Sequence, residues 1–513
     1  MPSPESAPPP ALRASGPSPR LGQASIQASA PVKSCSDARA IPSPVAGQRR
    51  DKPWQSFARR LCRSAIVVLV LAAGLTGCRE EGKPSPTPAP TKAPSPAAMA
   101  AAAAPASTPA GPVRLVLWHA WLGDRAEQVL QQAAERFHQQ YPLITVDPAC
   151  VGDESDLAVK TVAAVQAGHP PDLAVADGSQ VAELMKVGAT VPFEPYLNDP
   201  EIGLAQEERG DFYPGYWEAG IYREFGNQRL SFPFAKSALA MYYNMALLKR
   251  AGLKEAPKTW ADLEAACKAV SKGDVIGLAW REDGLTFDGF LYSRGARQLA
   301  DDQSRATFNG PEGVEALELL IRLSRVNAAL RVEEEGAEQG LFAQGKVAFT
   351  FGSTSEIASY AEAIKKAGST FEWGVAMIPQ GEATGAPRTV ASGTDLCILK
   401  TSEARQRAAW QFIRWFAEGE QAAQWAAATG YLPARRSAVA RLAASGYLAQ
   451  NPLLKEVYDR VVPYAYPEPN IRGEAEVHAA IASAWAAALS GNKASNQALD
   501  EAAAKADEVL GKK

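Results

Sequence analysis

The chain has 513 residues, a formal net charge of −3 at pH 7, and hydrophobic residues at 46% of its positions. This length predicts two or three structural units. Because so small a charge on so long a chain gives no field that gathers nucleic acid or anionic lipid, we expect no nucleic-acid partner.

The first 60 residues differ in composition from the rest of the chain. Residues 1–60 are rich in Pro, Ser, Ala and Arg and contain few aromatic residues. Such a composition cannot bury enough apolar surface to offset the entropy of ordering. We interpret this stretch as disordered, or as not translated.

An export and anchoring segment follows. A basic stretch at 59–63 precedes the apolar run 65–71 and the sequence Leu-Thr-Gly-Cys at 75–78. A basic end, a short apolar stretch and small residues before a cleavage point are typical of a signal peptide, here 61–77. Its end resembles the bacterial lipobox, whose cysteine, here Cys78, is diacylated and becomes the mature N-terminus. The alternative is a short buried helix that ends in cysteine.

The residues after Cys78 favour the anchor. Residues 78–112 consist largely of Pro, Ser, Thr and Ala without a periodic apolar face, so they form a tether between a surface and a folded body. The signal peptide begins later than the usual ~30 residues from the start. A start codon assigned too far upstream explains this, although no methionine lies between Met1 and Met99.

The folded body opens with alternating strand and helix patterns. An apolar stripe recurs at helical spacing through Ala126, Val129, Leu130, Ala133 and Phe137. A second helix is predicted at 155–167. Strands are predicted at 113–118, 143–146 and 172–176. This order predicts a doubly wound α/β sheet, in which ligands bind at the carboxyl ends of the strands.

The second half keeps α/β character. Thr259 is predicted to cap a helix, with Asp262 three residues on. Further strands are predicted at 347–351, 374–378 and 395–399, and helices at 402–418, 420–428, 474–489 and 496–510. Three tryptophans inside these helical patterns are assigned to packing: Trp410, Trp415 and Trp485.

The cysteines point to no metal or redox chemistry. None of the six forms a CxxC pair or lies close to a histidine in sequence. We interpret Cys150, Cys267 and Cys397 as small buried hydrophobic residues. We therefore expect no metal and no cofactor.

Six short motifs occur in the order found in family 1 extracellular solute-binding proteins of ABC transporters. They are PPDL at 170–173, FPF at 232–234, MYYN at 241–244, APKTWADL at 256–263, FAQGKVAF at 342–349 and TGYLP at 429–433. The chain resembles the maltose-binding and glycerol-3-phosphate-binding branch over 113–511. The resemblance implies a type II periplasmic-binding-protein fold with two lobes joined by hinge crossovers. The N-lobe would comprise 113–235 with 390–438, and the C-lobe 236–389 with 439–511.

The resemblance also implies a function. Such a protein is a lipid-anchored monomer of the cell envelope that captures a sugar or oligosaccharide between its lobes. Closure of the lobes on the ligand precedes delivery to ABC permease subunits. The alternative ligand is sn-glycerol-3-phosphate or another polyol phosphate, and a role in signalling rather than transport is also open.

Two tryptophans are candidate binding residues on local grounds. A sugar cleft needs aromatic faces that stack on pyranose rings and fixed polar groups that bond hydroxyls. Trp121 and Trp280 are each predicted to follow a strand, where loops face the cleft.

Further candidates come from the resemblance alone. Ser237 matches a polar cleft residue before the first crossover, and Gly393 matches a backbone donor at the second. Tyr431 matches a tyrosine that bonds ligand in glycerol-phosphate binders. Ser353, after the predicted strand 347–351, is aligned less securely.

Other positions depart from the glycerol-phosphate pattern. Glu154 stands where those proteins carry tyrosine, and the best matches to their glutamate are Asp177 or Gly178. Their phosphate-facing arginine falls near Glu474 and reaches Arg472 only with a shifted alignment. A carboxylate repels a phosphate, which favours a neutral sugar.

Two other classes were weighed. An exported hydrolase would need catalytic residues, yet there is no GxSxG or HExxH motif, and the four histidines stand in no catalytic pattern. Acidic pairs such as Asp153 and Glu154 could serve a glycosidase, but they are expected by chance among 56 acidic residues. A structural or adhesive lipoprotein would not need the six motifs. We therefore expect no enzyme activity.

Overall fold

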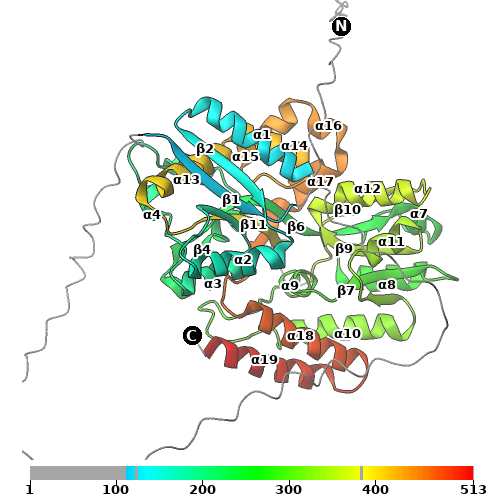
Figure 1. The fold of residues 1–513 in the computed structure, drawn as a ribbon. Coiled ribbons are helices and arrows are strands. Elements are labelled where there is room, and N and C mark those ends of the chain that lie inside the picture. Colours follow the sequence, from blue (N-terminus) through cyan, green and yellow to red (C-terminus); the bar gives the residue numbers. More distant parts are fainter. Residues whose placement is uncertain (1–110, 122–124, 382–384, 512–513) are drawn as a thin grey trace, which may run out of the picture. The chain divides into compact units, whose positions relative to one another are not determined.

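The computed structural model describes residues 111–121, 125–381 and 385–511 (Figure 1). All of them belong to one compact unit, Pro94–Lys513. Within these ranges no helix combines the length and apolar character that crossing a membrane requires. Several predictions lie outside the described residues: the extension 1–60, the signal peptide 61–77, Cys78 and the tether as far as residue 110.

A mixed ten-stranded sheet runs through the described residues. Its spatial order is β2 (Ile144–Cys150), β1 (Val113–His119), β3 (Leu173–Ala176), β11 (Thr389–Ile398), β6 (Phe232–Asn244), β9 (Val347–Ser353), β7 (Ile276–Arg281) and β8 (Ala329–Val332). Off this path, β10 (Trp373–Ala376) pairs with β6, and β12 (Ala465–Pro467) pairs with β11. A separate two-stranded sheet contains β4 (Ile221–Tyr222) and β5 (Gln228–Arg229).

Strand direction changes along the sheet. Strand β1 pairs in parallel with β2 and β3, and β7 pairs in parallel with β8 and β9. Between these groups β6 and β11 run antiparallel to each other, β11 is antiparallel to β3, and β6 is antiparallel to β9. The predicted alternation of strands and helices at the start of the body is confirmed, since helical crossovers are what parallel neighbours require.

The long strand β6 helps to link the two groups of strands. Its first half, to Ala238, pairs with β11, and its second half, from Leu239, pairs with β9. Nearly all of its 13 residues are buried. A strand covered on both faces is built from a continuous apolar run, which Phe, Ala and Met supply here.

Helices cover both groups of strands (Figure 1). In the first part of the chain they are α1 (Arg125–Gln140), α2 (Glu154–Gln166), α3 (Gly178–Lys186), α4 (Glu194–Leu197), α5 (Gln206–Gly210), α6 (Pro214–Glu218), α7 (Met245–Arg250), α8 (Trp260–Val270), α9 (Gly284–Tyr292) and α10 (Pro311–Arg325). They continue with α11 (Ala337–Ala343), α12 (Ile357–Lys366), α13 (Glu403–Phe416), α14 (Gly419–Thr429), α15 (Arg436–Ala444), α16 (Tyr447–Gln450), α17 (Pro452–Arg460), α18 (Glu474–Leu489) and α19 (Ser495–Gly511). Three short 3₁₀ turns are η2 (Arg223–Phe225), η3 (Thr354–Glu356) and η4 (Val462–Tyr464).

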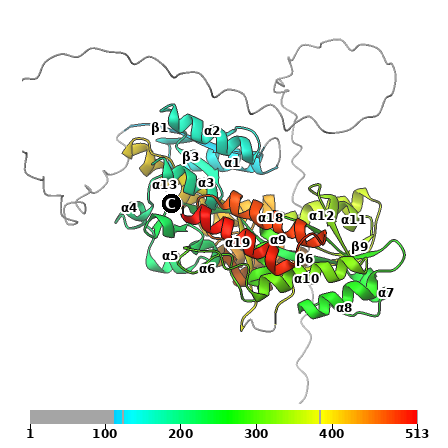
Figure 2. The same cartoon turned by 90° about the horizontal axis from the view of Figure 1, so that it is seen from below.

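Two large hydrophobic clusters form the core. One joins β1 to α1, α13 and α14 and contains Trp410 and Trp415. The other joins β7 to α8, α9, α10, α18 and α19 and contains Trp485. Helices α10, α18 and α19 of this second cluster pack against one another, and Figure 2 shows them from below. The prediction that these three tryptophans serve packing is confirmed.

Helix α8 begins with the capping box that its local sequence predicts. The Thr259 side chain accepts from the Asp262 backbone N–H, and the Asp262 carboxylate accepts from the Thr259 N–H, as the predicted capping box requires. Cys267 and Cys397 are buried, as predicted. Cys150 is a correction: it ends β2, at the rim of the sheet, and is only half-buried.

Candidate functional site

A cavity of about 370 Å³ lies where strands β1 and β3 end. Trp121 follows β1, and Asp177 follows β3 and caps α3 by accepting from the Gln180 N–H. Glu154 is the first residue of α2. The carboxyl ends of parallel strands meet at one edge of a sheet, so these side chains converge although their positions in the sequence are separate.

One wall of the cavity is aromatic. The indole N–H of Trp121 donates to the Tyr431 hydroxyl at 3.1 Å, and the two ring centroids are 6.0 Å apart. Behind them the buried Trp425 stacks on Tyr431 at 6.1 Å with an interplanar angle of 8°. Because Trp121 and Tyr431 are only half-buried, they offer apolar ring faces to the cavity together with polar edges.

The floor of the cavity is formed by β6 and β11. Gly393 has φ +93°, and a Cβ there would lie 2.1 Å from the Ala235 carbonyl oxygen, so the two strands approach closely only because this residue is glycine. The Lys236 ammonium donates to the Asp395 carboxylate at 2.7 Å. Both side chains are buried, and their charges neutralise each other.

Acidic residues line another part of the cavity. Glu468 follows β12, and Glu474 and His478 lie in the first turns of α18. Burial, reinforced by the Asp177 charge, raises the pKa of Glu468 to about 7. Burial, together with the nearby charge of Glu468, raises the pKa of Glu474 well above its usual range. Burial lowers the pKa of His478. Carboxyl groups that retain protons near neutral pH can both donate and accept hydrogen bonds.

Glu154 adds to the acidity of the cavity. Burial, and then the charge of Asp177, raises its pKa. The basic side chains that line the same cavity are Lys236, which is bonded to Asp395, and His478, whose pKa is lowered by burial. The cavity therefore presents acceptors and protonated acids rather than free positive charge.

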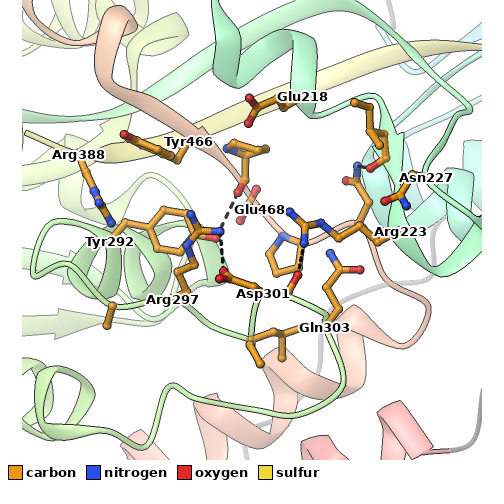
Figure 3. A pocket seen from close by; sticks show the side chains of 17 residues that line it. Glu218, Arg223, Asn227, Tyr292, Arg297, Asp301, Gln303, Arg388, Tyr466 and Glu468 are labelled. Atoms are coloured by element: carbon orange, nitrogen blue, oxygen red, sulfur yellow. Dashed lines mark hydrogen bonds and ion pairs between the residues drawn. The ribbon is translucent and has the colours of Figure 1, made fainter.

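A second cavity, of about 490 Å³, adjoins the first and shares Glu468 and Asn470 with it (Figure 3). Arg223 donates to the Asp301 carbonyl oxygen, and Arg297 lies 3.4 Å from the Asp301 carboxylate. Dashed lines in Figure 3 mark these two contacts, and each uses one of the five N–H donors of its guanidinium group. Its other lining residues include Glu218, Asn227, Tyr292, Gln303, Arg388 and Tyr466.

Five of the residues singled out from the sequence line the first cavity: Trp121, Glu154, Asp177, Gly393 and Tyr431. The remaining four lie elsewhere. Ser237 is buried in β6, where its carbonyl accepts from the Tyr216 hydroxyl at 3.1 Å. Ser353 ends β9 and caps η3. Arg472 forms an ion pair with Glu224.

The placement of Trp280 after a strand was wrong. Strand β7 continues to Arg281, and Trp280 lies inside it with no exposed surface. Its side chain packs against Trp485 with ring centroids 5.4 Å apart. The strand extends because Leu278 to Arg281 pair with β8, which places Trp280 in the core of the second cluster.

Sequence reasoning missed many lining residues, among them the ionisable Lys236, Glu468 and His478. Lys236 directly precedes Ser237 at the predicted crossover. Because Ser237 was already a candidate, its position could have pointed to Lys236 as well. Glu468 and His478 had no local signal, because they come from a connecting segment and from a helix that reach the cavity only through the tertiary fold.

The fold and the site define a class of protein: a mixed α/β protein with a cavity at the carboxyl ends of β1 and β3, beside the linking strands β6 and β11. The family model described as "Bacterial extracellular solute-binding protein" matches residues 132–456. The chain belongs to this family, and it is a solute-binding protein of the kind that serves ABC importers.

Relatives agree with this assignment. The chain is 26% identical over 417 residues to the sn-glycerol-3-phosphate-binding periplasmic protein UgpB of Escherichia coli O1:K1, which covers 77% of this chain and 91% of that protein. A Yersinia pseudotuberculosis protein of the same name is also 26% identical, with the same shares covered. These relatives are binding proteins, not enzymes.

Solved structures share the fold. The cyclic α-maltosyl-1,6-maltose binding protein of Arthrobacter globiformis superposes with TM-score 0.68 and 24% identity, covering 79% of this chain and all of that one. The sugar-binding protein MalE of Xanthomonas citri gives 0.67 at 21% identity, covering 78% and 98%. UgpB of Mycobacterium tuberculosis, in complex with glycerophosphocholine, gives 0.65 at 20%, covering 78% and 99%. The predicted maltose-binding-like α/β fold is thus confirmed.

Proposed function

We propose that the protein captures a sugar or oligosaccharide in the cavity between Trp121 and Glu468 and delivers it to the permease subunits of an ABC importer. One observation carries the choice of ligand: an aromatic pair, Trp121 and Tyr431, and several carboxyl groups line the same cavity. A pyranose has apolar ring faces and a rim of hydroxyls, so it complements both kinds of group at once.

The polar groups of the cavity suit hydroxyls better than phosphate. Carboxylates accept hydrogen bonds from hydroxyls, and protonated carboxyls such as Glu468 can donate to ring and hydroxyl oxygens. A phosphate instead needs a fork of donors without nearby carboxylates. Lys236 is engaged by Asp395, and the carboxyl groups of Glu154, Glu468 and Glu474 that line the cavity offer no positive charge to an anion.

The second candidate ligand is sn-glycerol-3-phosphate or another polyol phosphate. The two UgpB relatives that are 26% identical to this chain are sn-glycerol-3-phosphate-binding proteins, which favours this ligand. Helix α18 supports it too, since no side-chain cap satisfies the amides of its first turn, which begins at Glu474 beside the cavity.

We further propose that the cavity closes by hinge motion. The N-lobe would comprise 113–235 with 390–438, and the C-lobe 236–389 with 439–511. The support is that β11 pairs with β3 of one group, β6 pairs with β9 of the other, and β6 and β11 pair with each other, so these two strands link the groups. Ligand that contacts both sides stabilises the closed form by its differential affinity.

The cell-envelope anchor is also a proposal. The protein would be exported by the signal peptide 61–77 and held by lipid on Cys78, with 78–112 as the tether and a monomeric body outside. In a Cys78→Ala variant, radioactive fatty acid should no longer label the protein, which should stay unprocessed or become soluble. Label that persists in the variant contradicts the lipobox interpretation.

A ligand screen tests the capture function. A ligand present at 100 times its Kd stabilises the folded state by about 2.7 kcal/mol, so thermal shift detects it. We expect maltose, maltotriose or another sugar to stabilise the protein, and glycerol-3-phosphate and glycerophosphocholine to leave it unchanged. Calorimetric titration with Trp121→Ala should show weaker binding. Stabilisation by the phosphates alone would replace the sugar with the second candidate, and binding that Trp121→Ala leaves intact would place the solute elsewhere.

A further inference from the structure

Helix α9 contains one charged residue, Asp288, in the apolar sequence GLTFDGFLY. The residue has no exposed surface. Neither carboxylate oxygen has a hydrogen-bond partner among the residues that the structure describes. Removing an unpaired carboxylate from water is among the costliest burials in a protein, so this side chain either keeps its proton or takes a positive partner.

Two further ligating side chains face Asp288. One oxygen of Asp288, one of Glu468 and one ring nitrogen of His478 all lie within 4.8 Å of one another. In the described ranges, no lysine or arginine forms an ion pair with either carboxylate. Three electron-pair donors thus converge without a cation from the protein.

We propose that Asp288, Glu468 and His478 bind a divalent transition-metal ion, Zn²⁺ or Mn²⁺, at the edge of the solute cavity. The ion follows from the donor set. Imidazole together with carboxylates suits Zn²⁺ and Mn²⁺, whereas Ca²⁺ and Mg²⁺ take oxygen ligands throughout.

The spacing accommodates such an ion. The centre of three atoms at most 4.8 Å apart lies within about 2.8 Å of each, so small side-chain rotations reach the metal–ligand distance of about 2.0–2.2 Å. The Gln298 side-chain amide lies 2.9 Å from His478 Nε2. With its oxygen turned toward this nitrogen, the amide accepts the Nε2–H and leaves the other ring nitrogen to the metal, which is how metal-ligating histidines are oriented.

The site has an open side. Glu468 and His478 line the solute cavity, whereas Asp288 lies behind them. Three protein ligands leave at least one coordination position of a tetrahedral ion free. Water would fill this position, and a solute hydroxyl could replace it. Metal binding itself does not depend on which solute the cavity takes.

Metal analysis tests the site directly. Full-length protein without a histidine tag is incubated with ZnCl₂ or MnCl₂, gel-filtered and analysed by plasma mass spectrometry. We expect about one ion per chain, and at least tenfold weaker binding in Asp288→Asn, which keeps the side-chain shape. Glu476→Gln is the matched control, since Glu476 is an exposed acid in the first turn of α18, two residues before His478.

A second variant covers the case in which Asp288→Asn fails to fold. His478→Gln changes a half-buried residue, and it should lose the ion to the same degree. A chelator should lower the Tm of the metal-loaded parent but not that of either variant. Equal metal content in parent and variants, or no uptake by the parent, overturns the proposal. Either result leaves sugar capture untouched, because that is measured separately by calorimetry in chelator.

Discussion

Replacing Lys236 with methionine should destabilise the protein strongly. Its ammonium lies 2.7 Å from the Asp395 carboxylate, and the two side chains are 4% and 5% exposed. At an effective dielectric constant of 20, two charges at this distance attract by about 6 kcal/mol. Lys236→Met removes this attraction and leaves a buried carboxylate, a loss that typically costs about 3–5 kcal/mol. The Ser231 hydroxyl still donates to Asp395 at 2.7 Å, so we expect the lower end of that range.

Urea unfolding of four proteins measures this effect: the parent, Lys236→Met, Asp395→Asn and the double variant. The double variant contains no unpaired charge, so its loss should be smaller than the sum of the two single losses. Lys249→Met is the control, because the Lys249–Glu372 pair is more than half exposed and should contribute about 0–1 kcal/mol.

Two results would refute this reasoning. A loss below about 1 kcal/mol for Lys236→Met would mean that water reaches the pair in solution. Single losses that add to within about 0.5 kcal/mol would mean that the two charges do not interact.

Three further changes test the site and its frame. Tyr431→Phe removes the acceptor of the Trp121 indole N–H and should weaken sugar binding by about five- to two-hundred-fold in calorimetry, with little loss of stability; unchanged affinity would remove Tyr431 from the site. Gly393→Ala combines φ +93° with a contact to the Ala235 carbonyl, so it should cost more than about 1–3 kcal/mol in urea unfolding; a wild-type midpoint would contradict the close approach. Burial, then Glu338, raises the pKa of Glu356 to about 7. Because the folded state holds this proton more tightly, stability should fall between pH 4.5 and about 7, and Glu356→Gln should flatten this fall in thermal unfolding at a series of pH values; a variant that follows the parent curve would exclude the effect.

Local sequence patterns determined the secondary structure and the class of fold. Helix α18 occupies 474–489 as its pattern predicted, and the capping box at Thr259 forms because its two partners are only three residues apart. The apolar positions Trp410 and Trp485 are buried for the same reason: helical spacing fixes which face of a helix is apolar. The order of the six motifs was enough to identify the family.

Residues next to strand ends were also within reach of the sequence. Trp121, Glu154 and Asp177 line the cavity. Strands β1, β2 and β3 run parallel, so the segments that follow them lie at the same edge of the sheet. This rule failed for Trp280, since the length of β7 depends on pairing with β8, a strand about 50 residues further on.

Only the tertiary structure decided which charged groups meet. Lys236 is neutralised by Asp395 through the register of β6 and β11, and nothing in either local sequence specifies that register. Asp288, Glu468 and His478 come from α9, from the segment after β12 and from α18, and they approach within 4.8 Å only when both strand groups and their helices have packed. The physical reason is that hydrogen-bonded local structure depends on neighbours a few residues apart, whereas the charge of a cavity depends on side chains that packing brings together from distant parts of the chain.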